Sequence, residues 1–349
     1  MKHIFILNLL IVTLLASCQE ATTFSNEDSF WNTGEPSDYG LSSETVQSVF
    51  NKADEADNFY ALLVIVDGQL LVESYFEGRN ANSLFHLRSI TKNVTSALTG
   101  IALQEGHIES LNQPISSFYQ DLGETVDPSI TIDHMLHMTP GFRWNEQEEV
   151  VGFLTHSNGD PVHNLLQRSM SDVPGARFNY NTLAPHVLTD LIERSYGNSI
   201  MNFGNEFLFG PLDIELLSWE DDGYGRQWGG TGLQLRARDV AKFGLLYLQG
   251  GEWEGTSILS PEWVENSLSR TSEVPGLNTG YSRYWWVADS NDPPVVYGQG
   301  FGGQTLMLIP ELNAMIIAFQ EHLVSFEQHD VQWKFFVEEI YRPIYNELK

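Results

Sequence analysis

A serine and a lysine three positions apart could supply a nucleophile and its base. Ser89 and Lys92, one of only six lysines in the chain, lie in the stretch LRSITKNVTSALTGIALQEG, whose apolar residues recur at helical spacing. A helix places residues i and i+3 on one face, and burial lowers the pKa of an amine, so Lys92 could take a proton from Ser89. The same spacing also fits a serine N-cap followed by a surface lysine, so the rest of the chain must decide between the two interpretations.

Two further stretches carry residues that could complete such a site. The segment PGARFNYNTLAPHVLTDLIE places Tyr180, Asn181 and Thr182 just before an amphipathic helical pattern. A phenol beside a lysine can share its proton and act as a base or an acid, although a buried tyrosine can also be purely structural. The segment VVYGQGFGGQTLMLIP has closely spaced glycines in a strand-like run. Such glycines let a ligand approach the backbone, or they mark a bulge or tight turn.

The first element that must position these residues is a hairpin. Two apolar, β-rich runs at residues 60–66 and 69–76 flank Asp67-Gly68, which predicts two paired antiparallel strands. The preceding residues 41–56 have the pattern of an amphipathic helix. The Ser-x-x-Lys helix follows the hairpin directly.

The remaining elements complete the predicted fold. Residues from about 100 to 275 show mainly helical patterns. Three strand-like runs, YSRYWWVAD, PPVVYGQGFGGQTLMLIP and LNAMIIAFQEH, follow, and a last helix is expected over about 329–347. Strands at both ends with helices between them predict an α+β fold, in which one antiparallel sheet is formed from both chain ends, with flanking helices and an inserted, mainly helical region.

The three chemistry-bearing segments together resemble the serine β-lactamase and penicillin-binding-protein-like superfamily. SITK matches its Ser-x-x-Lys signature, and YNT resembles the Tyr-x-Asn motif of class C β-lactamases and their esterase relatives. The segments TIDHMLHMTPGFRWNE and WGGTGLQLRARDVAKFGLLYLQGG are also similar to family motifs. The resemblance covers about residues 41–345 and points to the branch of family VIII carboxylesterases and 6-aminohexanoate-dimer hydrolase. It implies a β-lactamase/transpeptidase-like fold.

The resemblance implies a role for each part of the site. Ser89 is the nucleophile, and Lys92 and Tyr180 act as general base and acid. The backbone N–H groups of Ser89 and Phe301 form the oxyanion hole. The residues implied in substrate binding are Trp144, Thr182, Gln299, Gly300 and Gly302. The expected reaction is hydrolysis of a small ester or amide through an acyl-enzyme on Ser89, with no cofactor and no metal.

Other functions remain open at this point. Gly298 stands where a β-lactamase has a lysine that helps to hold the β-lactam carboxylate. Losing a charge-assisted hydrogen bond costs roughly 1.5–3 kcal/mol, which disfavours efficient β-lactamase or penicillin-binding peptidase activity. A non-catalytic binding lipoprotein would be expected to lack Ser89, Lys92 or Tyr180, and all three are present. The aromatic residues Trp285, Trp286 and Tyr297 could line an apolar pocket or belong to the core.

Two other enzyme classes fit the sequence poorly. His134 and His137 are three residues apart without the glutamate of a His-Glu-x-x-His pattern, which argues against a zinc site. An α/β-hydrolase would show Gly-x-Ser-x-Gly after a strand. The string GNSIM around Ser199 lacks the second glycine and lies in a helical stretch.

The N-terminal sequence predicts export. Residues 1–17 combine Lys2, an apolar run and small residues, as in a signal peptide too short to remain as a membrane-spanning helix. The ending LASC resembles a bacterial lipobox, and Cys18 is the only cysteine, so lipidation at Cys18 is expected and a disulfide within the chain is excluded. We expect a tether over residues 18–40 and one catalytic domain over 41–349. The protein would then be a lipoprotein of the cell envelope, periplasmic or on the outer surface.

Composition excludes a further class of partner. The 349 residues are 42% hydrophobic, which is enough to bury a substantial core. The chain carries 18 basic and 46 acidic residues, a formal charge of −28, with no basic patch. Because phosphate binding needs clustered lysine and arginine, nucleic acid is not an expected partner. The expected partners are a small-molecule substrate and the membrane reached through the anchor, and the sequence leaves the oligomeric state open.

Overall fold

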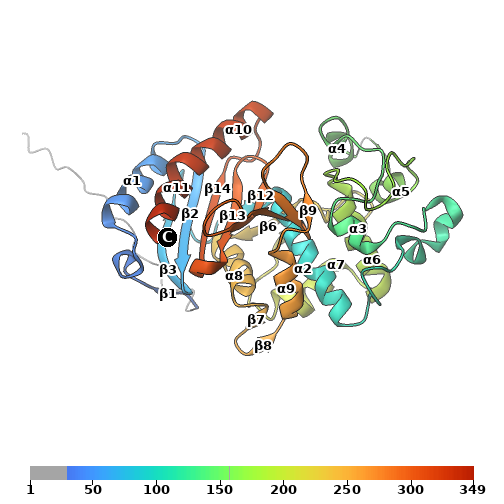
Figure 1. Ribbon diagram of the computed structural model, residues 1–349, viewed down its shortest axis with the longest axis horizontal. Coiled ribbons are helices and arrows are strands. Elements are labelled where there is room, and N and C mark those ends of the chain that lie inside the picture. Colours follow the sequence, from blue (N-terminus) through green and yellow to red (C-terminus); the bar gives the residue numbers. More distant parts are fainter. Residues whose placement is uncertain (1–29, 157) are drawn as a thin grey trace, which may run out of the picture.

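The computed structural model describes residues 30–156 and 158–349, shown in Figure 1. The predicted signal peptide and Cys18 lie outside these residues. A nine-stranded sheet in the order β1-β3-β2-β14-β13-β12-β11-β10-β9 forms the centre of one half of the molecule. Its strands are β1 (Asn32–Thr33), β2 (Phe59–Val66), β3 (Gln69–Tyr75), β9 (Ser272–Glu273), β10 (Gly280–Ser282), β11 (Trp285–Ala288), β12 (Val295–Gly300), β13 (Gln304–Ile309) and β14 (Ala314–Gln320).

The sheet is built from both ends of the chain, as the sequence predicts. The hairpin β2–β3 turns at Asp67 and Gly68, both with positive φ, and β14 pairs antiparallel with β2 along its whole length. Almost every residue of β2 is buried, because helices cover both faces of the sheet. All strand pairs in the sheet are antiparallel except β1 with β3.

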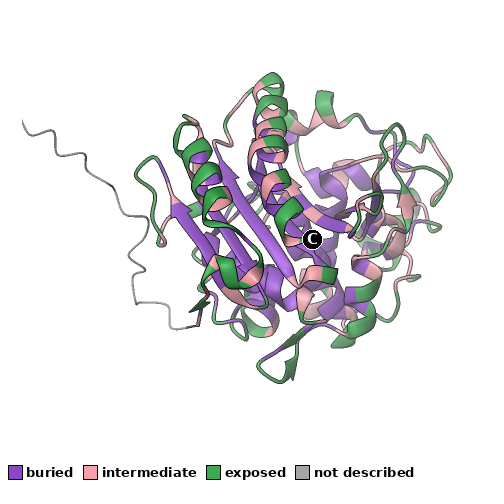
Figure 2. Ribbon diagram, turned by 60° about the vertical axis from the view of Figure 1, so that its left-hand side comes forward, coloured by how far each residue is buried: buried purple, intermediate pink, exposed green. Residues whose placement is uncertain are grey.

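Helices from both termini cover one face of the sheet. These are α1 (Ser43–Asp54), α10 (Phe326–Phe335), the π-helical η7 (Phe336–Tyr341) and α11 (Arg342–Leu348), which run side by side in Figures 1 and 2. The buried faces of these helices and of the strands beneath form a separate apolar cluster that includes Val49, Ile316 and Phe336. The predicted helices at 41–56 and 329–347 are therefore both present.

The region between β3 and β9 is mainly helical. Its helices are α2 (Thr91–Gln104), α3 (Ile132–Leu136), α4 (Glu146–Leu154), α5 (Pro161–Leu166), α6 (Leu183–Tyr196), α7 (Ile200–Gly204), α8 (Ala237–Leu248) and α9 (Pro261–Ser267). A small sheet of β4 (Leu84–His86), β6 (Leu233–Arg236) and β5 (Ser218–Trp219) and the hairpin of β7 (Glu252–Trp253) and β8 (Thr256–Ser257) complete it. Helix α8 packs on the other face of the large sheet, and α2 packs against α6. These helices and that face of the sheet share the larger apolar core.

Short helical turns make up the remaining regular structure. They are η1 (Pro36–Tyr39), η2 (Arg88–Ile90), η3 (Ile115–Phe118), η4 (Gln120–Thr125), η5 (Asn205–Phe209) and η6 (Pro310–Leu312). No helix in the described part of the chain is both long enough and apolar enough to span a membrane.

Two sequence-based boundaries need correction. The predicted tether over 18–40 is too long, because Trp31 is buried and β1 pairs with β3, so residues from about 30 onward belong to the folded domain. The run expected as one strand at 293–310 is the antiparallel pair β12–β13, which turns at residues 301–303. Gly302 and Gly303 both have positive φ there, which a glycine adopts without steric penalty.

Candidate active site

Ser89 and Lys92 meet where the turn η2 continues into helix α2. The Lys92 side chain is 1% exposed, and its Nζ lies 2.9 Å from the Ser89 Oγ. The three-residue spacing therefore places the amine beside the hydroxyl, as the sequence suggests. The interpretation of Lys92 as a surface residue after a capping serine is wrong, because the side chain is buried.

Two other acceptors fix the orientation of the Lys92 amine. Nζ donates to the Gly230 carbonyl oxygen at 2.8 Å and to the Thr182 Oγ1 at 3.1 Å. A neutral amine has two hydrogens and one lone pair. With both hydrogens held by these acceptors, the lone pair points to the third neighbour, the Ser89 hydroxyl. The arrangement therefore suits Lys92 to accept the serine proton.

Burial tunes the amine for this task. Desolvation lowers the pKa of Lys92 from 10.5 to about 8, while the nearby Glu146 charge opposes the shift. At neutral pH a useful fraction of Lys92 is then unprotonated. An exposed lysine would be almost entirely protonated at the same pH.

Tyr180 completes the group from the loop before α6. Its ring centroid lies 5.0 Å from the Lys92 Nζ. Burial and the Glu146 charge raise the pKa of Tyr180, and a hydrogen bond to the Ser89 side chain opposes them. The phenol therefore stays protonated at neutral pH and can donate a proton, while Lys92 is the better base.

The residues after Tyr180 hold it in place. The Asn181 side chain is buried, and its Oδ1 accepts from the backbone N–H groups of Leu183 at 2.8 Å and Ala184 at 3.3 Å. Asn181 thus satisfies free donors in the first turn of α6. The second residue of the YNT motif fixes the helix start instead of facing the cavity.

Glu146, at the start of α4, is a residue of the candidate site that sequence reasoning missed. Its carboxylate accepts from the Thr182 N–H at 2.9 Å, from the Thr182 hydroxyl and from the Trp144 Nε1 at 2.8 Å. Because the Thr182 hydroxyl donates to Glu146, its oxygen is free to accept from Lys92. The carboxylate therefore sets the donor direction of the hydroxyl that orients the Lys92 amine. Its position at the end of the family-like segment TIDHMLHMTPGFRWNE was the one available signal.

The glycines of β12 have a packing role. A Cβ at Gly298 would lie 2.5 Å from the Asn93 Oδ1, and one at Gly300 would lie 2.5 Å from the Leu87 carbonyl oxygen. The strand thus fits closely against the segment that carries Ser89. The space beside Gly298 holds the protein's own Asn93, which corrects the idea that this glycine opens the strand to substrate.

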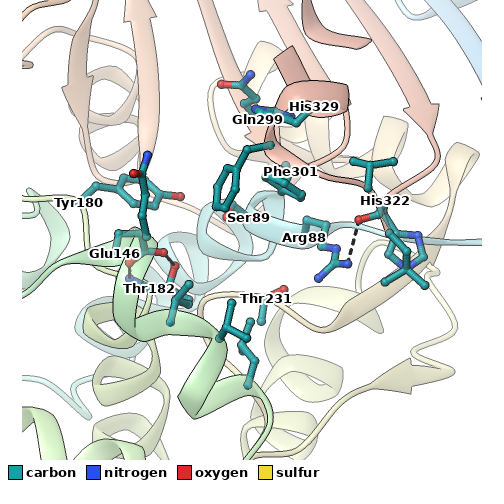
Figure 3. A pocket seen from close by; sticks show the side chains of 18 of the residues that line it. Arg88, Ser89, Glu146, Tyr180, Thr182, Thr231, Gln299, Phe301, His322 and His329 are labelled. Carbon is teal, nitrogen blue, oxygen red and sulfur yellow. Dashed lines mark hydrogen bonds between the residues drawn. The ribbon is translucent and has the colours of Figure 1, made fainter. Parts of the chain in front are cut away.

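A cavity of about 720 Å³ lies over Ser89 and is shown in Figure 3. Of the predicted site residues, those that line it are Ser89, Tyr180, Thr182, Gln299, Gly300 and Phe301. Its walls are mostly apolar and include Val150, Leu154, Trp286, Leu323 and Phe326. Trp144 and Gly302 are not among its lining residues. Trp144 binds Glu146, and the Gly302 N–H donates to the His329 Nδ1 at 3.0 Å.

Phe301 occupies the tip of the β12–β13 turn, beside Ser89 (Figure 3). Its ring stacks on His329 with centroids 4.7 Å apart and meets Phe326 edge-on at 5.2 Å. These contacts from α10 hold the turn that carries the expected second oxyanion donor.

The histidines excluded as metal ligands have local roles. His134 forms a capping box with Thr131 at the start of α3, and the His137 Nδ1 lies 2.9 Å from the Asp133 carbonyl oxygen. Across the part of the chain that the structure describes, no group of three or more histidine, cysteine or acidic residues could hold a metal ion.

The fold and this serine, lysine and tyrosine group define a hydrolase of the serine β-lactamase fold. Residues 59–334 match the family described as Beta-lactamase, and the chain belongs to that family. A 6-aminohexanoate-dimer hydrolase of Paenarthrobacter ureafaciens is 26% identical over 282 residues, which are 74% of this chain and 71% of the relative.

Solved structures share the fold. A Bacillus anthracis protein described as a candidate 6-aminohexanoate-dimer hydrolase has a TM-score of 0.70 at 23% identity, over 81% of this chain and 79% of its own. The octameric penicillin-binding protein homologue of Pyrococcus abyssi has a TM-score of 0.65 at 19% identity, over 80% and 73% of the two chains. The predicted family and fold class are thereby confirmed, and so is the prediction that the chain is a hydrolase.

Proposed function

We propose that this protein hydrolyses small esters or amides through an acyl-enzyme on Ser89. The observation that carries the proposal is the geometry of Lys92. Its Nζ lies 2.9 Å from the Ser89 Oγ, and its other two hydrogen-bonding directions are taken by fixed acceptors. The lysine is therefore oriented toward the serine, and burial lowers its pKa to about 8.

Acylation begins with transfer of the Ser89 proton to Lys92. The serine oxygen attacks the substrate carbonyl, and the N–H groups of Ser89 and Phe301 receive the developing negative charge. Tyr180 then gives its proton to the leaving alcohol or amine as the bond to the acyl carbon breaks. The Lys92 ammonium restores the phenol proton, which leaves both groups in their starting states.

Deacylation uses the same groups, with water in place of the serine hydroxyl as the nucleophile. A water molecule attacks the Ser89 ester and gives a proton to Lys92, directly or through Tyr180. The carboxylic acid leaves as the serine oxygen regains its proton. One water is consumed and one ester or amide bond is broken in each cycle.

Support for the class of bond and for the size of the substrate comes from a relative and from the cavity. The Paenarthrobacter ureafaciens relative is named as a 6-aminohexanoate-dimer hydrolase. The cavity over Ser89 has a volume of about 720 Å³ and mostly apolar walls, which suits a small organic ester or amide. Gly298 stands where a β-lactamase has a lysine, and Asn93 packs against it, so this position offers no ammonium group to a β-lactam carboxylate. We therefore expect no stable acylation by labelled penicillin, and a strong labelled band would favour the penicillin-binding alternative.

The Ser89→Ala variant tests the proposal. It should abolish turnover of a short-chain 4-nitrophenyl ester, while its melting temperature should stay close to that of the wild-type protein. The melting temperature shows that lost activity reflects lost chemistry and not unfolding. Turnover that is unaffected by the substitution would contradict the assignment of Ser89.

We also propose that the protein is an exported lipoprotein anchored at Cys18. The support is the lipobox-like ending of the leader and the absence of any other cysteine. Expression of the full chain with radiolabelled palmitate should label the wild-type protein and not the Cys18→Ala variant. Equal labelling of both would refute the anchor.

A further inference from the structure

The residue before the nucleophile has an unusual backbone conformation. Arg88 has a φ of 50°, in the left-handed region that glycine adopts freely and that is unfavourable for a residue with a Cβ. A glycine here would keep the same chain path without strain. A strained residue beside a reactive group indicates that its side chain has a use.

The Arg88 guanidinium is only partly satisfied by the protein. Its Nη2 donates to the His322 carbonyl oxygen at 2.9 Å, while the buried Nε has no hydrogen-bond partner among the described residues. Glu220 and Glu321 act on Arg88 through charge alone. Glu220 instead pairs with His86 at 3.5 Å, and Glu321 accepts from the Leu323 N–H at 2.8 Å.

The position of Arg88 in the cavity indicates which part of a substrate it would meet. Arg88 lines the cavity over Ser89. In Figure 3, Tyr180 lies on one side of Ser89, and Arg88 lies on the other side with His322. Tyr180 protonates the leaving group in the proposed function, so the leaving half of the substrate lies on the Tyr180 side. The acyl half then extends toward Arg88.

The opposite end of the cavity also has a charged residue, but it is already paired. The Glu146 carboxylate accepts from Thr182 and Trp144. Glu146 is therefore already engaged by the protein, whereas Arg88 has hydrogen-bond donors without a protein partner among the described residues. Val150, Leu154 and Trp286 contribute apolar lining to the same cavity.

We propose that Arg88 binds a carboxylate at the far end of the acyl chain, so that the preferred substrates are half-esters or half-amides of dicarboxylic acids. This inference rests on the proposed function. An arginine is suited to the role because its planar guanidinium can donate two parallel hydrogen bonds to a carboxylate. Hydrolysis of such a substrate releases the free dicarboxylic acid and the alcohol or amine.

Two matched substrates test the proposal. One is the mono-4-nitrophenyl ester of adipic acid, and the other is the same molecule with its free carboxyl group capped as the neutral N-methyl amide. Wild-type kcat/KM should favour the carboxylate substrate by about 10- to 100-fold, the range expected for a charge-assisted hydrogen bond. Arg88→Gly and Arg88→Gln should reduce this ratio to about one, and Arg88→Lys should keep part of it. Arg88→Gly also removes the backbone strain, which protects against a variant that fails to fold.

The outcomes separate the two proposals. If the neutral ester is hydrolysed in a Ser89-dependent way but wild type shows no preference for the carboxylate, the hydrolase proposal stands and the role of Arg88 is refuted. A preference that survives in Arg88→Gly refutes it as well. If wild type hydrolyses neither ester, the proposed function itself fails and this inference falls with it.

Discussion

Replacing Lys92 by methionine should show how much the burial of this amine lowers the free energy of unfolding. In the folded protein the pKa of Lys92 is about 8, against its ordinary value of 10.5. At about 1.4 kcal/mol per pH unit, this gap corresponds to roughly 3 kcal/mol of destabilisation at pH 7. Methionine removes that term but leaves two acceptors, the Gly230 carbonyl and the Thr182 hydroxyl, without a donor, which costs about 1–3 kcal/mol each. The variant should be inactive, and its stability at pH 7 should lie within a few kcal/mol of wild type, so the pH dependence of the difference carries the test.

The pH dependence of this difference identifies its cause. A lysine with a lowered folded pKa destabilises the fold fully below that pKa, and the penalty shrinks as the pH rises from about 8 to 10.5. The stability of Lys92→Met relative to wild type should therefore decrease by roughly 2–3 kcal/mol between pH 7 and pH 10. Groups other than Lys92 titrate in both proteins and cancel in the difference.

Urea denaturation of both proteins at pH 7, 8.5 and 10 measures the effect. Lys334→Met is a suitable control, because it removes a lysine whose side chain is 72% exposed and therefore carries no burial penalty of the Lys92 kind. A stability difference for Lys92→Met that is independent of pH would refute the burial-lowered pKa. The role of Lys92 as base would then lose its physical basis.

Three further predictions concern other residues of the site. In wild type, kcat/KM should rise with pH with a midpoint near 8, because Lys92 acts as a base only when it is unprotonated. Glu146→Gln removes a negative charge that raises the pKa of Lys92, so the midpoint of the pH–rate profile should move to lower pH. A shift of the midpoint to higher pH would contradict the assignment of Lys92. Tyr180→Phe should lower kcat by roughly 10²–10⁴-fold with little change in melting temperature, and a near wild-type kcat would remove Tyr180 from the mechanism. Gly300→Ala would bring a Cβ to 2.5 Å from the Leu87 carbonyl oxygen and should destabilise the protein by about 1–3 kcal/mol in urea denaturation, whereas unchanged stability would show that β12 can move away.

Local patterns in the sequence predicted the elements that depend on near neighbours. Asp67-Gly68 between apolar runs specified the β2–β3 hairpin, because both turn residues adopt positive φ readily. The spacing of Ser89 and Lys92 placed hydroxyl and amine on one helical face. These features need no information from distant parts of the chain.

Features that depend on contacts between distant segments could not be predicted. The role of Glu146 arises because α4 meets Thr182, which is 36 positions away in sequence. Gly298 is confined by Asn93, which lies on another element. Strand β1 is two residues long and cannot show the alternation that identifies a strand in a sequence. Its pairing with β3 could therefore not be predicted, and the tether predicted over 18–40 includes residues that belong to the folded domain.

Covalent labelling of the intact protein tests the central claim most directly. After reaction with a fluorophosphonate probe, peptide mass spectrometry should find one adduct on Ser89, and the adduct should be absent in Ser89→Ala and form much more slowly in Lys92→Met. If Ser89 stays unmodified under conditions where a related esterase reacts, or if the adduct lies on another residue, Ser89 is not the activated nucleophile described above.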